Sequence, residues 1–158
     1  TPRFSFITWV AMKERLSTGD RMQKWNGSAN IACVLCQEPV ETLRHLFFEC
    51  SYSEQIWRGL MRGVMEEQYT ADWGRLLRLI TRDLSWGKVK AFTIKYMFQL
   101  AVHSIWCERN KRRHGEEPCP AEILSKRMDK TMRNKFTILQ RKRDKDLEGG
   151  MRFWFSTR

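Results

Sequence analysis

The sequence predicts an all-α protein in which a small zinc-stapled helical domain is followed by a basic helical region. Two observations predict this. Apolar residues recur at helical spacing along most of the chain, and three cysteines and one histidine fall within one short stretch, at Cys33, Cys36, His45 and Cys50. The first observation gives the fold class and the second gives a metal site, so we expect a CCHC domain over residues 1–66 and a helical basic region over residues 67–158.

The four residues form a ligand set for one tetrahedral zinc ion. Their order is a Cys-x2-Cys pair, then His45, then Cys50. Thiolates and neutral imidazole are donors that Zn²⁺ prefers, and four protein ligands leave no position for an activated water. The alternative is a chance grouping, since the chain holds five cysteines and three histidines. The Cys-x2-Cys spacing favours a metal site, so we predict one structural zinc ion, and a hydrolase with an open zinc site is the minor alternative.

The spacing of the last two ligands predicts a broken helix. A short helix can open at Glu41 and Thr42, with an apolar face provided by Leu43, Leu46 and Phe47. His45 and Cys50 are five positions apart, so on a straight helix they would point about 140° away from each other. Both can reach one metal only if the helix that carries His45 breaks near Glu49, just before Cys50.

Three further helices are expected around this unit. A helix over residues 4–16 presents a core face, and Thr18 can cap a short second helix that ends near Asn26. Ser53 is the expected N-cap of a third helix after Cys50. The second helix contains Met22 and Trp25. The expected core residues of the other two helices are Phe6, Trp9, Val10 and Leu16 in the first and Ile56, Trp57, Leu60, Met61 and Val64 in the third.

The rest of the chain predicts three more helices. The first begins at Asp72 with a stripe that includes Leu76, Ile80 and Leu84 and ends around residues 85–87; the second is a long helix over residues 88–111. The third, over about residues 121–147, carries a narrow apolar stripe through a basic surface. Narrow stripes dock weakly on a core, so we expect this last helix to be partly detached.

The charge predicts a polyanionic partner. The chain has a formal net charge of +11, and residues 105–158 hold 15 Lys and Arg against 8 Asp and Glu. Such a bias is typical of nucleic-acid binding, although a solvated basic helix is the alternative. The candidate phosphate contacts are Arg109, Lys111, Arg112, Arg113, Lys126, Lys130, Arg133, Arg141, Lys142 and Arg143.

Several runs in the first part resemble the reverse-transcriptase zinc-binding domain of plant LINE-type (non-LTR) retrotransposon proteins. They are Phe6-x2-Trp9, Arg15-Leu16-Ser17-Thr18, Cys33-x2-Cys36, Glu41-Thr42-x2-His45-Leu46-Phe47-x2-Cys50 and Trp57. The resemblance covers about residues 2–65, and Trp106 with Glu108-Arg109-Asn110 resembles a segment often found downstream. It implies a C-terminal piece of a larger polyprotein in which Cys33, Cys36, His45 and Cys50 bind zinc.

The resemblance also implies a non-catalytic role. No Tyr-x-Asp-Asp run is present, and the region after residue 66 lacks the strands with spaced carboxylates that a ribonuclease H needs. The expected function is a nucleic-acid-binding accessory module of a reverse transcriptase, with RNA or DNA as partner. The alternative is a structural brace within the larger enzyme.

The expected location is intracellular and nuclear. The odd number of cysteines disfavours a secreted disulfide framework, and no apolar run approaches the roughly twenty residues that a membrane span needs. The sequence leaves open whether RNA or DNA is preferred.

Overall fold

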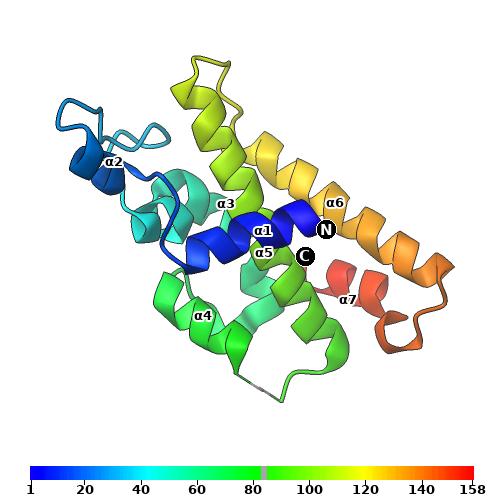
Figure 1. Cartoon of the computed structure of the whole chain (residues 1–158). Coiled ribbons are helices and arrows are strands. Elements are labelled where there is room, and N and C mark those ends of the chain that lie inside the picture. The colour runs from blue at the N-terminus through cyan, green and yellow to red at the C-terminus, as the bar shows by residue number, and fades with distance from the viewer. Residues whose placement is uncertain (83–84) are drawn as a thin grey trace.

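The computed structural model describes residues 1–82 and 85–158, and every regular element in these two ranges is helical. This confirms the all-α prediction (Figure 1). The helices are α1 (Pro2–Met12), α2 (Gly19–Trp25), α3 (Ser51–Met65), α4 (Trp73–Thr81), α5 (Lys88–Arg113), α6 (Ala121–Arg141) and α7 (Gly150–Ser156). Shorter helical turns span His45–Glu49, Glu66–Gln68 and Lys145–Leu147. No helix among the described residues combines the length and apolar character needed to cross a bilayer.

Helix α5 is the central element, and α1, α3, α4, α6 and α7 all pack against it (Figure 1). Its buried side chains point in several directions from the helix axis, as expected of a helix surrounded by others. These residues include Ile94, Met97, Phe98, Ala101 and Ile105. Because the longest helix contacts both the first and the last helix of the chain, it unites segments that are far apart in sequence.

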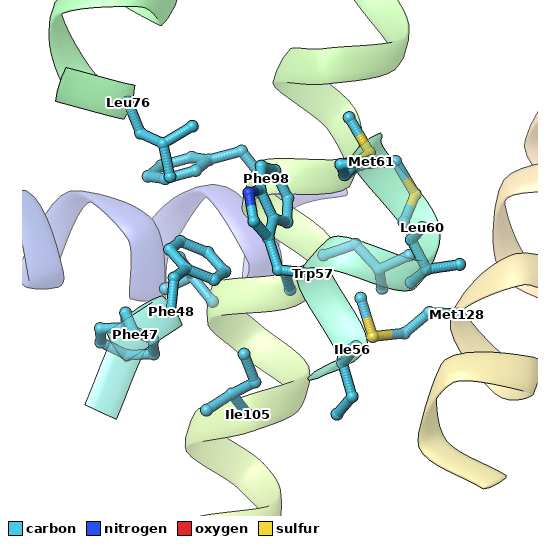
Figure 2. Packing of buried hydrophobic residues seen from close by; sticks show 14 of the residues in the cluster. Phe47, Phe48, Ile56, Trp57, Leu60, Met61, Leu76, Phe98, Ile105 and Met128 are labelled. Atoms are coloured by element: carbon cyan, nitrogen blue, oxygen red, sulfur yellow. The ribbon is translucent and has the colours of Figure 1, made fainter. Parts of the chain in front are cut away.

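An aromatic cluster forms the centre of the core. The ring centroids of Phe48 and Trp57 lie 4.6 Å apart, those of Trp73 and Phe98 5.4 Å, and those of Phe48 and Phe98 5.9 Å. Figure 2 shows Phe48 and Trp57 beside Phe98 of α5. The cluster joins residues from both sides of position 66. The division into domains at 1–66 and 67–158 stays a prediction, because residues of both parts belong to one core.

Helix α1 turns a different face to the core than the sequence predicts. Phe6 is 61% exposed and Trp9 is 52% exposed, so the expected core role of these two aromatics is wrong. Phe4, Thr8 and Ala11 are buried instead. They also repeat at helical spacing, and the small side chains of Thr8 and Ala11 allow α1 to approach α5 closely.

Helix α6 is docked rather than partly detached, and it ends at Arg141 rather than near residue 147. Met128, Met132 and Phe136 are at most 2% exposed and belong to the common core. Arg143, with a φ of 54°, turns the chain back after the helix. A narrow stripe suffices here because α6 packs between α3, α5 and α7.

The C-terminal segment forms a helix that the sequence left without interpretation. Trp154 of α7 is fully buried, and its indole Nε1 donates a hydrogen bond of 2.8 Å to Asp129 Oδ1 of α6. The guanidinium of Arg158 lies 3.7 Å from the centre of the Trp154 ring. A Cβ on Gly150 would lie 2.1 Å from the Phe136 ring, so this close approach requires glycine.

Smaller differences concern helix ends. Helix α3 begins at Ser51 with Cys50 at its N-cap, and Ser53 is buried inside the first turn. Helix α4 begins after the N-cap Asp72 as expected but ends at Thr81. Its expected core residue Leu84 lies outside the described residues.

Candidate functional site

The structure brings Cys33, Cys36, His45 and Cys50 together. One ligand atom from each of them lies within 4.8 Å of all the others. The Sγ atoms of Cys33 and Cys50 are 3.9 Å apart, and Cys36 Sγ lies 3.2 Å from His45 Nε2. Zinc–sulfur bonds of about 2.3 Å at tetrahedral angles place two sulfurs about 3.8 Å apart. The cluster therefore fits one zinc ion with four protein ligands.

The first two ligands lie on a tight turn. The backbone N–H of Gln37 donates to the Cys33 carbonyl at 2.7 Å, and the Cys33 N–H donates to the Glu38 carbonyl at 2.9 Å. Gln37 has a φ of 69°, in the left-handed region that lets the chain reverse after Cys36. These bonds hold the Cys33 and Cys36 side chains on the same side of the turn.

The other two ligands meet because the helix between them is broken. The backbone leaves helical geometry at Phe47, with ψ of 96°, and at Phe48, with φ of 84°. Ser53 Oγ accepts the N–H of Phe48 at 3.1 Å, and burial of the Phe48 ring holds this unfavourable conformation. The predicted break before Cys50 is confirmed, and the two phenylalanines that precede Glu49 form it.

The three cysteine thiols of the cluster need a bound cation to ionise together. The pKa of Cys33 is raised, chiefly by its hydrogen bond to Cys50 and also by burial, and burial raises the pKa of Cys36. The same hydrogen bond lowers the pKa of Cys50. A cluster of buried thiols resists gathering several negative charges unless a cation neutralises them. A divalent ion at this position would supply that charge and hold all three as thiolates.

The segment that carries the four ligands matches a known protein family. Residues 1–57 match the family model described as zinc-binding in reverse transcriptase. This segment is a reverse-transcriptase zinc-binding domain. The match contains all four ligands, and with the Cys₃His geometry it indicates one structural zinc ion. No curated protein and no solved structure matches the chain.

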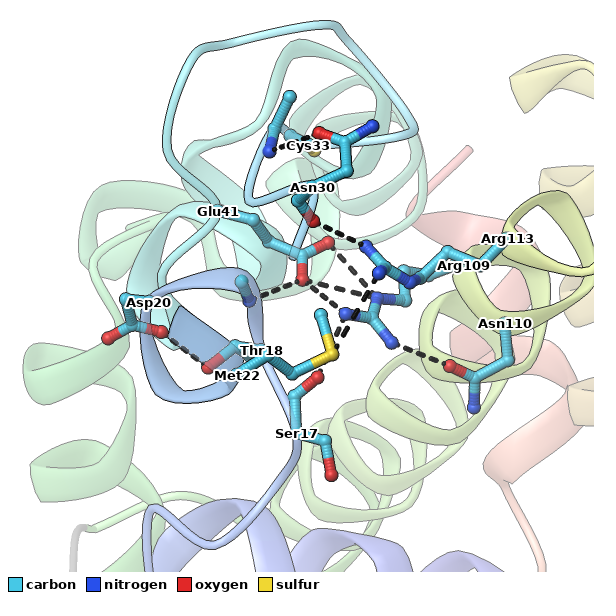
Figure 3. Close-up of polar contacts among 12 residues, drawn as sticks. Ser17, Thr18, Asp20, Met22, Asn30, Cys33, Glu41, Arg109, Asn110 and Arg113 are labelled. Carbon is cyan, nitrogen blue, oxygen red and sulfur yellow. Dashed lines mark hydrogen bonds and ion pairs between the residues drawn. The ribbon is translucent and has the colours of Figure 1, made fainter. Parts of the chain in front are cut away.

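The zinc-binding domain is held to the rest of the chain by a pair of charges that sequence reasoning missed. Arg109 of α5, predicted to contact phosphate, is only 3% exposed, and its Nη2 lies 2.6 Å from Oε1 of the fully buried Glu41. Figure 3 shows this pair. Glu41 Oε1 also accepts the N–H of Gly19 at 3.0 Å, and Arg109 Nη2 donates to the Ser17 carbonyl at 2.9 Å. Arg109 is therefore a structural residue, because burial keeps it from solvent and from phosphate.

Two neighbouring arginines are also restrained. Arg112 Nε lies 2.8 Å from Glu108 Oε1, and Arg112 Nη2 donates to the Cys119 carbonyl, which leaves 13% of its side chain exposed. Arg113 is half-buried, and its Nη1 donates to the Asn30 carbonyl at 3.3 Å. Both guanidiniums therefore lie beside the zinc-binding segment with limited freedom.

The remaining predicted contacts are on the surface. Arg133 is paired with Asp129 at 2.8 Å. Arg127 was not among the predicted contacts, but it is exposed on the same helix next to Lys126. The exposed candidates are Lys111, Lys126, Lys130, Arg141, Lys142 and Arg143.

Proposed function

We propose that the chain is a zinc-dependent nucleic-acid-binding accessory module of a retrotransposon reverse transcriptase, without catalytic activity of its own. The observation that carries this proposal is the exposed basic surface of α6 and the turn that follows it. Lys126 and Lys130 lie one helical turn apart on α6, and Arg141 to Arg143 continue the charge at its end. A straight helix spans about 22 Å from Lys126 to Arg141, enough to meet several successive phosphates.

The zinc ion has a supporting role in this proposal. A closed four-ligand site offers no coordination position to a substrate, so its contribution is to fix the fold of the segment. The partner is RNA or DNA and not a membrane, the source is a plant LINE-type element, and the location is intracellular and nuclear. The rest of a reverse-transcriptase polyprotein is the second expected partner.

One observation favours the alternative of a structural brace. Phe6, Trp9 and Met12 are 61%, 52% and 42% exposed on the outer face of α1. An exposed apolar group of this kind is typical of a surface that docks on another protein. In the brace hypothesis this face of α1 rests on the parent enzyme, and the basic helices follow its acidic surfaces.

The salt dependence of binding separates the two functions. The zinc-loaded chain is titrated against labelled RNA and DNA over a range of salt concentrations. If six phosphates are engaged, the logarithm of affinity falls against the logarithm of salt concentration with a slope of about −5 on duplex and about −4 on single strands. No binding at low salt, or an affinity that does not change with salt concentration, would contradict nucleic-acid binding and favour the structural-brace hypothesis.

A further inference from the structure

A pocket of about 270 Å³ lies between the turn that carries the first two zinc ligands and the C-terminal end of α5. It is not part of the metal cluster. Figure 3 shows two of its residues, with the Arg113 side chain reaching back to Asn30. The pocket is lined by Asn30, Ala32, Val34, Gln37, Arg112 and Arg113.

The walls of the pocket combine three kinds of group. Arg113 supplies a cation whose planar guanidinium suits phosphate oxygens and the faces of aromatic rings, whereas the charge of Arg112 is paired with Glu108 and its guanidinium lies over the Tyr52 ring. Ala32 and Val34 supply a small apolar surface. Asn30 and Gln37 supply carboxamides, the groups that form paired hydrogen bonds with the edges of nucleobases.

The two carboxamides have hydrogen-bonding capacity to spare. Asn30 Oδ1 accepts the N–H of Ala32 at 3.1 Å, and Gln37 Nε2 donates to the Val34 carbonyl at 3.4 Å. Among the hydrogen bonds of the described residues, neither Asn30 Nδ2 nor Gln37 Oε1 has a partner. The pocket thus offers a free donor, a free acceptor and a positive charge around an apolar surface.

This combination selects a ligand with a flat ring, polar edges and a negative charge. The volume lies just below the range of about 300–1,000 Å³ typical of small-molecule sites, so the pocket holds one such unit. In a duplex each base is stacked and paired, so neither its faces nor its Watson–Crick edge is available to such a pocket. Sequence-reading contacts to RNA are accordingly made with unpaired bases.

We propose that this pocket binds one unpaired nucleotide of a single-stranded nucleic acid. The base lies against Ala32 and Val34, and the phosphate lies beside Arg113. The inference rests on the proposed nucleic-acid binding. It adds a binding site for one nucleotide and a preference for single strands. The exposed basic surface of α6 contacts phosphates of either form.

The test compares single-stranded RNA and DNA oligonucleotides with duplexes of the same sequence, by fluorescence anisotropy on the zinc-loaded full chain. Val34→Asp places a carboxylate in the pocket. Val40→Asp is the matched control, because Val40 lies in the same segment, is 45% exposed and does not line the pocket. We expect Val34→Asp to weaken single-strand binding about tenfold, the effect of losing one stacked base, and duplex binding less than about twofold. Val40→Asp should change both by less than about twofold.

A second variant is needed because Val34→Asp lies between two zinc ligands and, if it disturbs the turn, lowers the zinc content of the protein. Gln37→Ala removes an exposed carboxamide and should reduce the preference for single strands about threefold. If the wild-type chain binds nucleic acid but both pocket variants keep its single-strand preference, the pocket inference is wrong and the proposed function stands. If the wild-type chain binds neither form, the proposed function itself fails.

Discussion

Glu41 and Arg109 form a buried ion pair between the zinc-binding segment and helix α5. Arg109 Nη2 lies 2.6 Å from Glu41 Oε1, and the two side chains are 4% and 0% exposed. Glu41 belongs to the zinc-binding segment and Arg109 to α5. Among the described residues each is the ion-pair partner of the other, so the zinc-binding segment depends on a residue far beyond the end of the family match.

Removing one partner should therefore be costly. Arg109→Ala leaves a buried carboxylate without its cation, and we expect a loss of about 3–5 kcal/mol in the free energy of unfolding. The measurement is urea unfolding of the zinc-loaded chain, followed by circular dichroism. The double variant Glu41→Gln/Arg109→Ala should recover part of the loss, because no charge remains buried. The exposed Arg141→Ala is the control and should change stability by at most about 0.5 kcal/mol; an Arg109→Ala value in that range would contradict the role of the pair.

The zinc-binding segment should not fold cooperatively by itself. A fragment of residues 1–66 lacks Arg109 and also Phe98, whose ring packs against Phe48 and Trp57. With one equivalent of zinc we expect metal binding but a broad, weakly cooperative thermal transition. A sharp transition like that of the full chain would instead support an independent domain over residues 1–66.

The basic surface of α6 and its following turn can be tested by charge removal. Replacing Lys126, Lys130 and Lys142 with alanine should make the salt slope for duplex binding shallower by about 2.7, since each phosphate contact contributes about 0.9. The matched control replaces three exposed lysines elsewhere, Lys13, Lys24 and Lys95. Equal effects of the two triple variants would show that binding follows total charge and not this surface.

Zinc binding should release protons. Because the pKa values of Cys33 and Cys36 are raised in the metal-free chain, both thiols carry protons at pH 7. Zinc binds the thiolates, so at least about two protons leave, and zinc affinity rises with pH and falls as the solution becomes acidic. Calorimetric titrations in buffers of different ionisation enthalpy measure the number released. Near-zero release at pH 7 would mean that these thiols are not ligands.

Local patterns in the sequence predicted the metal cluster and most helices. The spacing of Cys33, Cys36, His45 and Cys50 is a short-range feature, and the break between His45 and Cys50 follows from helix geometry alone. The apolar stripe of Met128, Met132 and Phe136 could likewise be recognised in the sequence, because these residues are spaced four apart.

The features that the sequence did not predict depend on contacts between distant segments. Phe6 and Trp9 fit a helical face as well as Phe4, Thr8 and Ala11 do, and only the approach of α5 selects the second face. A basic residue such as Arg109 has the same appearance in sequence whether it faces solvent or a buried Glu41. Helix α6 docks between α3, α5 and α7, and the part of this contact made by α7 rests on Trp154, a single buried residue in a short helix that carries no periodic signal.

The central claim is that one zinc ion stabilises the fold of the zinc-binding segment. It is tested most directly by measuring zinc content and helical structure as the metal is removed by a chelator. The zinc of the purified full chain is measured by mass spectrometry, and a chelator titration is then followed by far-ultraviolet circular dichroism. We expect one equivalent of zinc, and a loss of helical signal that follows its removal and is restored when zinc is returned. A chain that contains no zinc, or that keeps its full helical signal and thermal transition after the metal has been removed, would contradict the account.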